Sequence, residues 1–204
     1  RLVSTFNFPE VATLCVPELV SDPRDSDAHT QEVAELLPGL INEDQSALIL
    51  FTSWRQLNGV LRLLPDSLIQ SLLVQGEDAK QVLISRHREN VLKGKSSFLV
   101  GLASFAEGLD LPGNLCRHVI IAKIPFAVPD DPIDQTVAEF LESQGRNPFY
   151  EMSLPDAALK LVQACGRLIR NEHDYGKITL LDRRIVTKSY GKLLLNTLPP
   201  YRRK

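Results

Sequence analysis

The stretch Ala47-Leu-Ile-Leu-Phe51 is a short, uninterrupted apolar run that ends at the hydroxyl pair Thr52-Ser53. A run of this length without polar residues is typical of a strand buried on both faces, as in a parallel sheet covered by helices. The next segment, residues 54–64, repeats large apolar side chains at intervals of three and four residues and predicts an amphipathic helix. This strand and helix decide the fold class, because the rest of the chain repeats the pair.

Further short apolar runs predict strands, and longer stretches with helical periodicity separate them. The predicted strands cover residues 47–51, 72–74, 97–101, 119–122 and 177–181, and the predicted helices cover residues 30–40, 54–64, 78–92, 132–143, 154–170 and 189–198. This alternation predicts one α/β domain over residues 1–204, with helices on both faces of a mainly parallel sheet. Ligands of such folds bind beyond the carboxyl ends of the strands, where we expect the functional residues.

The composition fits a globular domain, because 44% of the 204 residues are hydrophobic and 24% are charged. Cys15, Cys116 and Cys165 are far apart and form no C-x-x-C pair, which argues against a disulfide framework and against a zinc or iron–sulfur site in this chain. They favour a reducing, cytoplasmic setting. No apolar run has the length of a membrane span, so we expect no membrane partner. The start at Arg1 rather than Met predicts a fragment of a longer protein.

The net charge of −2 hides a strong asymmetry along the chain. Residues 1–159 carry 12 Lys and Arg against 22 Asp and Glu, whereas residues 160–204 carry 11 against 3. The basic end favours an anionic partner, such as nucleotide phosphate or nucleic acid. A solvated basic face without a partner remains the alternative.

Gly94-Lys95-Ser96 resembles the end of a phosphate-binding P-loop but does not complete one. Glu89 stands where the first glycine of the motif belongs, and a predicted helix precedes the triplet where a P-loop has a strand. We therefore predict an ordinary turn from helix to strand, with Gly94 ending the helix.

Gln163-Ala-Cys-Gly166 resembles the nucleophile segment of cysteine proteases of the caspase type, with His118 lying 47 residues before Cys165. Arg167 stands where that signature needs glycine. On a helix over residues 154–170, Cys165 falls on the apolar face, which predicts a core residue. The remaining histidines, at positions 29, 87 and 173, have no metal-ligand spacing, so we predict surface or capping roles for them and no metal site.

The polar face of the same predicted helix carries Gln163, Arg167 and Arg170 at positions i, i+4 and i+7, within an arc of about 60°. Gly166 leaves a gap beside them through which another surface could approach. Guanidinium groups bind phosphate oxygens in pairs of hydrogen bonds and stabilise charge during phosphoryl transfer, so the face suits a polyphosphate. The alternative is a salt-bridged surface, with partners in residues 171–174.

Two further polar stretches follow predicted strands. In the first, residues 104–113, Gly108 allows a tight turn between Glu107 and Asp110, whose carboxylates could orient water, a ribose hydroxyl or a partner arginine. In the second, Thr52 and Ser53 could bind backbone phosphate, although Ser53 could equally be a plain helix cap.

Together, residues 50–53, 104–113 and 163–170 resemble motifs IV, V and VI of superfamily 2 helicases of the XPD/DinG group. Four shorter stretches occur in the same order and spacing as in that group: Lys123-Ile-Pro-Phe126, Asn147-Pro-Phe149, Leu180-Leu-Asp-Arg183 and Tyr190-Gly-Lys192. The chain is most similar to the bacterial DinG-like branch, which includes YoaA, because residues 105–108 read Phe-Ala-Glu-Gly where eukaryotic members usually have Phe-Trp-Glu-Gly.

The resemblance implies the second RecA-like motor domain, of the P-loop NTPase type, from an ATP-dependent 5′–3′ DNA helicase of repair or replication. Such a domain shares ATP and magnesium with the first motor domain, which would carry the P-loop and a 4Fe–4S cluster outside this chain. It also implies a bacterial cytoplasmic protein associated with the nucleoid. We expect the fragment alone to be inactive.

By the same resemblance, Gln163, Arg167 and Arg170 would face ATP, with the arginines acting as fingers on the γ-phosphate. A second group, Glu107, Gly108, Asp110 and Gly166, would couple the nucleotide state to the grip on DNA. A third group, Thr52, Ser53, Ser104 and Phe105, would contact the single-strand backbone.

The basic segment 184–204 suggests an alternative role as a protein-docking module. Leu193-Leu-Leu195 and Tyr201 are expected to be exposed there. The partner would be a replisome subunit, an accessory protein of DNA polymerase III.

Overall fold

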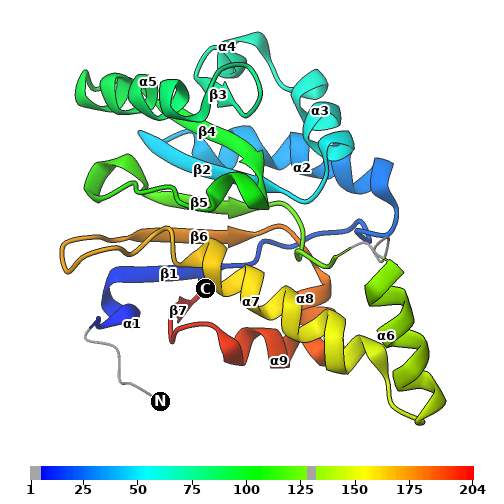
Figure 1. The fold of residues 1–204 in the computed structure, drawn as a ribbon. Helices are drawn as coiled ribbons and strands as arrows, with labels where there is room; N and C mark the ends of the chain where they lie inside the picture. Colours follow the sequence, from blue (N-terminus) through cyan, green and yellow to red (C-terminus); the bar gives the residue numbers. More distant parts are fainter. Residues whose placement is uncertain (1–5, 128–131) are drawn as a thin grey trace.

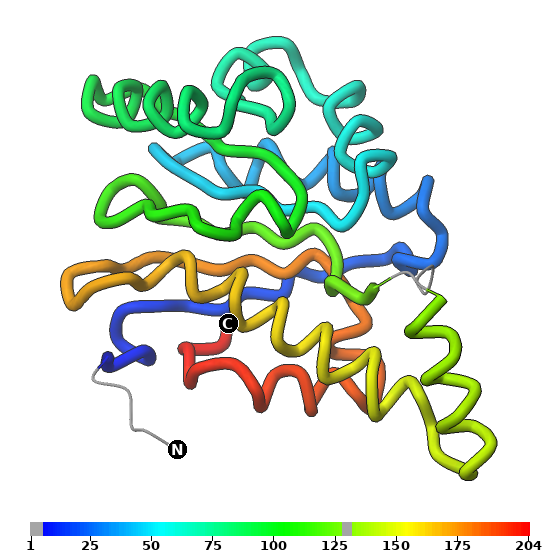
Figure 2. Tube along the Cα trace, viewed as in Figure 1, coloured from blue at the N-terminus to red at the C-terminus, as the bar shows by residue number. Residues whose placement is uncertain are grey.

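A sheet of seven strands runs through residues 6–127 and 132–204, the part of the chain that the computed structural model describes (Figure 1). The strand order is β3-β4-β2-β5-β6-β1-β7, and all the strand pairs in it are parallel. The strands are β1 Ala12–Cys15, β2 Ser46–Phe51, β3 Leu72–Val74, β4 Ser97–Leu102, β5 His118–Ile121, β6 Gly176–Leu180 and β7 Arg202–Arg203. Because β1 pairs with both β6 and β7, the two ends of the described chain lie side by side (Figure 2).

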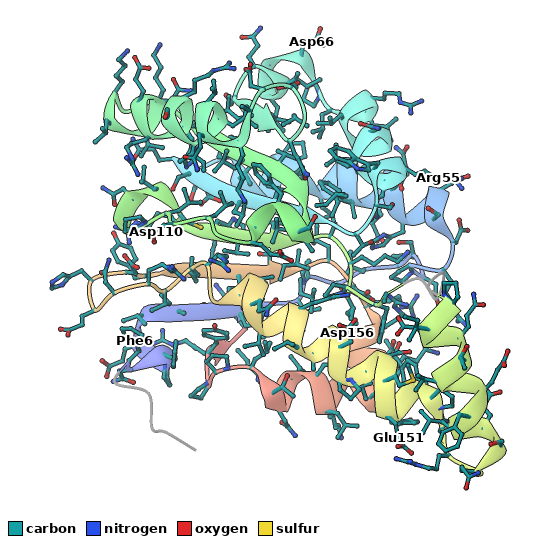
Figure 3. All side chains as sticks on the ribbon, viewed as in Figure 1. Phe6, Arg55, Asp66, Asp110, Glu151 and Asp156 are labelled. Atoms are coloured by element: carbon teal, nitrogen blue, oxygen red, sulfur yellow. The ribbon has the colours of Figure 1, made fainter. Side chains whose placement is uncertain are left out.

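Helices cover both faces of this sheet. The α-helices are α1 Phe8–Val11, α2 Ser26–Ile41, α3 Trp54–Leu63, α4 Asp66–Ile69, α5 Lys80–Leu92, α6 Pro132–Ser143, α7 Leu154–Cys165, α8 Arg184–Thr187 and α9 Ser189–Thr197. Short 3-10 turns span η1 Ala103–Ala106 and η2 Gly113–Leu115, and a π-helical turn, η3, spans Phe149–Ser153. Charged side chains such as Arg55, Asp66 and Glu151 point outward (Figure 3).

The core is divided in two by the sheet, because alternate residues of each strand point to opposite faces. Leu48 and Leu50 of β2 pack with the α7 and α9 layer, whereas Ile49 and Phe51 pack with the α2 and α3 layer. Every residue of β2 is buried, which is why its sequence shows no polar alternation. The prediction of a three-layer α/β fold with a parallel sheet is confirmed.

Two strands were not predicted from the sequence. The residues of β1 alternate between buried and half-buried, and those of β7 are two exposed arginines, so neither strand forms an apolar run. Both lie on one side of the sheet, where β7 is the edge strand. Charged residues on an edge strand discourage pairing with another chain.

The predicted helix over residues 154–170 is wrong at its end, because α7 ends at Cys165. The N–H groups of Arg167 and Leu168 bond to carbonyls three residues back, which tightens the chain into a turn. After the turn, Leu168 is fully buried and Ile169 nearly so. The burial of these two neighbouring apolar side chains breaks the helical register that the sequence pattern assumed.

The turn at Gly94-Lys95-Ser96 is confirmed as an ordinary connection from α5 to β4. Gly94 has φ +72°, the left-handed conformation that ends many helices, and Lys95 N–H donates to the Asn90 carbonyl at 2.9 Å. The triplet leads into the amino end of β4, at the edge of the sheet opposite the strand carboxyl ends. None of the helices in residues 6–127 and 132–204 combines the length and apolar character that crossing a bilayer requires.

The surface or capping role predicted for His29 and His87 is wrong, since both side chains are fully buried, as is His118. Each ring joins two segments that are distant in the sequence. His118, for example, contacts the Asp44 carboxylate at 2.6 Å through Nδ1 and the Thr179 hydroxyl at 2.7 Å through Nε2. Burial lowers the pKa of all three rings, although the Asp44 carboxylate partly opposes this for the pKa of His118.

These histidines predict an acid-sensitive domain. We expect the free energy of unfolding to decrease as the pH falls below about 6.5, because the unfolded chain then binds protons at rings that the folded chain keeps neutral. The decrease is at most about 1.4 kcal/mol per histidine per pH unit. Urea denaturation at pH 7.5, 6.5 and 5.5 measures it, and His87→Gln should reduce the slope. Equal stability at all three values would contradict the expectation.

Candidate functional site

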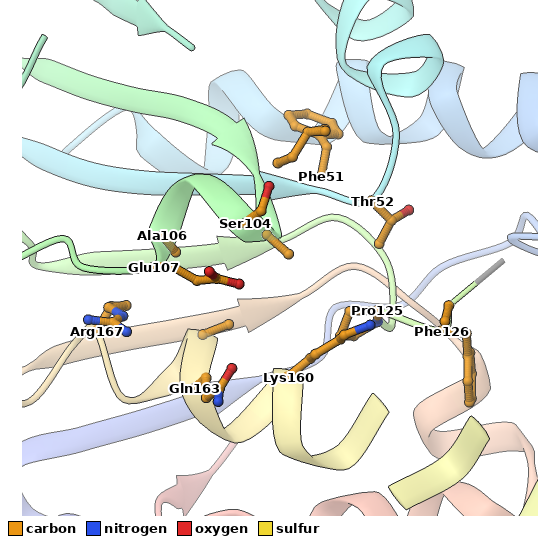
Figure 4. A pocket seen from close by; sticks show the side chains of 14 residues that line it. Phe51, Thr52, Ser104, Ala106, Glu107, Pro125, Phe126, Lys160, Gln163 and Arg167 are labelled. Carbon is orange, nitrogen blue, oxygen red and sulfur yellow. The ribbon is translucent and has the colours of Figure 1, made fainter. Parts of the chain in front are cut away.

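A cleft of about 380 Å³ lies at the carboxyl edge of the sheet, where β2, β4 and the loop after β5 meet α7 (Figure 4). We call it the carboxyl-edge cleft. Its lining residues are Phe51, Thr52, Leu102, Ala103, Ser104, Ala106, Glu107, Pro125, Phe126, Ala127, Lys160, Gln163, Ala164 and Arg167. The position agrees with the expectation that the functional residues gather beyond the strand ends.

Five of the predicted site residues, from all three helicase-like motifs, line this cleft: Thr52, Ser104, Glu107, Gln163 and Arg167. They come from the end of β2, from η1 and the residue after it, and from α7 and the turn that follows it. The other predicted site residues do not line it: Ser53, Phe105, Gly108, Asp110, Gly166 and Arg170. The fold therefore joins the three motifs in space, but only part of each motif faces the opening.

Arg167 stands at one end of the cleft and is held by the motif V segment. Its Nη1 donates to the Leu109 carbonyl at 3.0 Å. Its Nε is buried and has no hydrogen-bond acceptor among the described residues. Burial, followed by the charge of Arg170, lowers the pKa of Arg167, whereas Glu107 and Asp110 oppose the shift. Arg167 thus has a hydrogen-bond donor without an acceptor. A further anion beside it would stabilise the positive charge of its guanidinium group.

Arg170 does not line the cleft and is exposed, but it lies close enough to Arg167 for its charge to lower the pKa of Arg167. The Arg170 Nε contacts the Asp110 carboxylate at 3.3 Å. The salt-bridged alternative is therefore confirmed for this side chain, but its partner is Asp110 and not a residue of the expected segment 171–174. An ion pair as exposed as this one contributes only about 0–1 kcal/mol, so Arg170 can exchange Asp110 for another anion at little cost.

The two arginines therefore do not continue the polar face of α7. Because the helix ends at Cys165, Arg167 and Arg170 lie on the turn that follows it. Gln163 alone of the three belongs to the helix. The two arginine side chains do not form a stripe along the helix. Both contact the motif V segment, and the turn in that segment determines where they lie.

Asp174 joins motif V to motif VI. Its structural role was not predicted from the sequence. Its buried carboxylate accepts hydrogen bonds from the N–H groups of Gly113 at 2.8 Å, Arg170 at 2.7 Å and Asn171 at 2.9 Å. Three donors from two chain segments hold the turn after α7 against the end of motif V. Its place just before β6 is the only sequence signal that could have marked it.

The motif V turn has the shape predicted for it. Gly108 has φ +69°, and apart from its two chain neighbours no described residue has an atom within 4 Å of an added Cβ, so the space beside its Cα is open. Lys80 Nζ donates to the Glu107 carbonyl, so α5 also supports the turn. The open backbone at Gly108 would allow a ligand to approach closely.

The remaining predicted DNA contacts differ in exposure. Ser53 caps α3, because its hydroxyl accepts a hydrogen bond from Gln56 N–H at 3.3 Å, and it remains exposed. The Phe105 side chain is only 4% exposed and packs in the core against Gly101. Only the backbone of Phe105 could reach a DNA strand, whereas Thr52 and Ser104 both line the cleft (Figure 4).

Asp182 supports the wall of the cleft that Pro125 and Phe126 form. No role was predicted for it from the sequence. Its fully buried carboxylate accepts a hydrogen bond from Ile124 N–H at 2.9 Å and binds the Arg184 guanidinium at 2.6 Å. The next two residues along the loop from Ile124, Pro125 and Phe126, line the cleft. The buried ion pair therefore fixes one wall.

The three cysteines are free thiols. Cys165 is buried as predicted, and burial raises its pKa to about 12, as it does for Cys116. His118 is committed to Asp44 and Thr179, so it cannot activate Cys165. Residues 6–127 and 132–204 contain no group of three or more His, Cys, Asp or Glu side chains placed to hold a metal ion.

The expected exposure of the C-terminal segment is largely wrong. Leu194 is fully buried and Tyr201 is 6% exposed, so both belong to the core. Leu195 is half-buried, and Leu193 alone of the three leucines is exposed. Helical periodicity turns Leu194 of α9 toward the sheet and Leu193 away from it.

Comparisons with known proteins agree with this architecture. The model of the helicase C-terminal domain family matches residues 39–201. The ATP-dependent DNA helicase DinG of Photobacterium profundum is 44% identical over 205 residues, which cover 99% of this chain and 30% of that protein. DinG of Escherichia coli (strain K12) is 40% identical over 98% of this chain and 28% of that protein.

Among solved structures, an XPD helicase aligns with a TM-score of 0.70 at 20% identity, over 95% of this chain and 35% of that one. The likeness confirms the RecA-like fold expected from the sequence. The expected closeness to YoaA stays a prediction. This chain spans less than a third of the length of the two DinG relatives. With the family model matched over most of its residues, the chain belongs to the helicase C-terminal domain family.

Proposed function

We propose that this chain is the second motor domain of an ATP-dependent 5′–3′ DNA helicase of DNA repair and replication. The observation that carries the proposal is the carboxyl-edge cleft, which gathers an arginine, a glutamine, a carboxylate and two hydroxyl groups from all three motifs. The two DinG relatives are, by their names, ATP-dependent DNA helicases. The full-length protein would act in the bacterial cytoplasm at the nucleoid.

Arg167, Gln163 and Arg170 would complete an ATP site whose other half lies on the first motor domain. The unused Nε of Arg167 supports this role, because a phosphate oxygen would supply the acceptor that the described residues lack. When the domains close on ATP, the guanidinium groups would stabilise the charge that develops on the γ-phosphate. Gly166 leaves room beside them for the other domain.

Magnesium would accompany ATP, and the cleft does not offer a site for it. Glu107 is the one carboxylate among the described lining residues, and magnesium sites need more oxygen ligands than one carboxylate supplies. We assign magnesium and the 4Fe–4S cluster to the preceding part of the protein, as the family resemblance implies. No step of the mechanism proposed for this chain passes through either group.

Thr52 and Ser104 would grip the DNA backbone, with Ser53 and the backbone of Phe105 beside them. Hydroxyl and N–H groups bind phosphate oxygens without reading bases, so binding would be independent of sequence.

Motif V would link this grip to the nucleotide. Arg167 bonds to the Leu109 carbonyl and Arg170 to Asp110, and both acceptors follow Ser104 closely in the sequence. If a phosphate draws either arginine away, the segment Glu107 to Asp110 loses a support, and Gly108 gives it the freedom to move. ATP binding and hydrolysis would in this way loosen and restore the grip on the strand.

The polarity of unwinding tests this proposal. We expect the full-length protein to hydrolyse ATP faster when single-stranded DNA is present, and to unwind a duplex with a 5′ single-stranded tail but not one with a 3′ tail. A fluorescence-quenching strand-separation assay with the two substrates measures this. Unwinding from the 3′ tail would contradict the polarity, and absence of both ATP hydrolysis and DNA binding would contradict the function.

The docking alternative rests on a smaller surface than the sequence suggested, because Leu194 and Tyr201 are core residues. Deleting residues 184–204 would remove them and would confuse loss of docking with loss of folding. Leu193→Ser leaves the core intact and is the suitable variant for a pull-down with a replisome subunit.

A further inference from the structure

Trp54 is the one tryptophan of the chain, and it is 43% exposed. Tryptophan carries a large apolar ring and is highly buried on average, so an exposed one beside a binding site is informative. Trp54 is the first residue of α3, and the helix buries Leu57 in the core while leaving Trp54 outside it. Helix packing therefore does not account for this ring.

The ring lies close to the proposed path of the DNA strand. Trp54 follows Thr52 of the carboxyl-edge cleft by two residues, so their Cα atoms are within about 7 Å. The intervening Ser53 uses its hydroxyl to cap α3, which fixes where the helix begins and hence where Trp54 stands.

Gly76 supports the far edge of the indole without covering it. The ring atom Cη2 lies 3.7 Å from the position that a Cβ on Gly76 would occupy, and Gly76 has φ +94°, which favours glycine. The preceding residue, Gln75, accepts a hydrogen bond from Leu102 N–H at 2.8 Å. Leu102 lines the cleft just before Ser104, so the indole and the two hydroxyl groups share one edge of the sheet.

The two carboxylates that follow Gly76 in the sequence both have partners, so they would repel an anionic strand only weakly. Asp78 is paired with Arg86 at 2.7 Å, and the Glu77 carboxylate accepts a hydrogen bond from Val74 N–H. Lys80 adds a positive charge near the cleft, because its Nζ lies 5.4 Å from the centroid of the Phe105 ring.

The geometry points to Trp54 as a stacking platform for one base of the single-stranded DNA. The contact rests on the proposed function and adds to it a residue that holds a base rather than a phosphate. Stacking on an aromatic ring tolerates every base, because each base has a π-face, so the platform would strengthen the grip without making it sequence-specific.

The test compares the full-length protein on two oligonucleotides of equal length, oligo(dT) and a base-free strand with the same phosphates. We expect Trp54→Ala to weaken binding to oligo(dT) about 5- to 100-fold and to leave binding to the base-free strand nearly unchanged. Trp54→Phe should retain most of the affinity. Tyr175→Ala is the matched control, since Tyr175 is an exposed aromatic residue just before β6, at the opposite edge of the sheet. Fluorescence anisotropy gives the dissociation constants.

Equal affinity of Trp54→Ala and the parent for oligo(dT) would overturn the inference and leave the proposed function standing. A loss of the same size on both strands would also overturn it, because a backbone contact or a structural defect would then explain the change. A parent protein that binds neither strand and hydrolyses no ATP would overturn the proposed function, and the inference with it.

Discussion

Replacing Arg167 with alanine in the full-length protein should lower the ATP turnover number by about 10³-fold or more while single-stranded DNA binding persists. The expectation follows from where the side chain lies. Arg167 lines the carboxyl-edge cleft with a buried Nε that has no acceptor among the described residues. Arg170→Ala should have an effect in the same direction, because the Arg170 guanidinium needs only to leave an exposed pair with Asp110 in order to bind phosphate.

Steady-state ATPase assays with saturating DNA measure the effect, and a DNA-binding assay on the same variants separates catalysis from grip. Arg167→Lys keeps the charge but loses the planar fork, so it should recover only part of the turnover. Arg146→Ala is a matched control, since Arg146 pairs with Glu151 on the surface and does not line the cleft. Turnover that is unchanged in both Arg167→Ala and Arg170→Ala would refute the proposed arginine fingers.

Replacing Asp182 with alanine should destabilise the domain by about 3–5 kcal/mol, the usual effect of removing one partner from a buried ion pair. Asp182 is fully buried, and its loss leaves the Arg184 guanidinium and Ile124 N–H without their acceptor. At about 2–4 °C per kcal/mol for a domain of this size, the melting temperature should fall by about 6–20 °C. Differential scanning calorimetry of the chain measures it.

A double-mutant cycle locates the effect in the pair. Arg184→Met should be less harmful in a chain that already carries Asp182→Ala than in the parent, because the guanidinium is then already unpaired. Asp134→Ala, on the exposed side of α6, should change the melting temperature little. A fall of less than about 2 °C for Asp182→Ala would show that the buried pair does not hold this wall of the cleft.

Most of the sheet could be predicted from the sequence, because a parallel strand buried on both faces must be apolar throughout. Residues 47–51 and 98–102 show this plainly. The strands β1 and β7 could not be predicted in the same way, since they lie toward one edge and carry half-buried or charged residues. Three buried histidines were also missed, because a polar ring in the core is possible only where distant segments supply its hydrogen-bond partners.

The candidate site was predicted as a set of residues but not as a geometry. The motifs identified Thr52, Ser104, Glu107, Gln163 and Arg167, and the fold brings all five to one cleft. The end of α7 at Cys165 could not be seen in the periodicity, because the apolar residues after it fit a helical pattern equally well. The turn depends instead on Asp174, which accepts hydrogen bonds from both motifs.

The sequence by itself determined the fold class, the family and the edge of the sheet where the site lies, since these follow from apolar periodicity and from motifs that are local in the chain. Only the tertiary structure decided what the arginines touch, that Phe105 and Tyr201 are buried, and that Trp54 is exposed beside the cleft. These features depend on contacts between segments tens of residues apart. Residue spacing along the chain carries no record of such contacts.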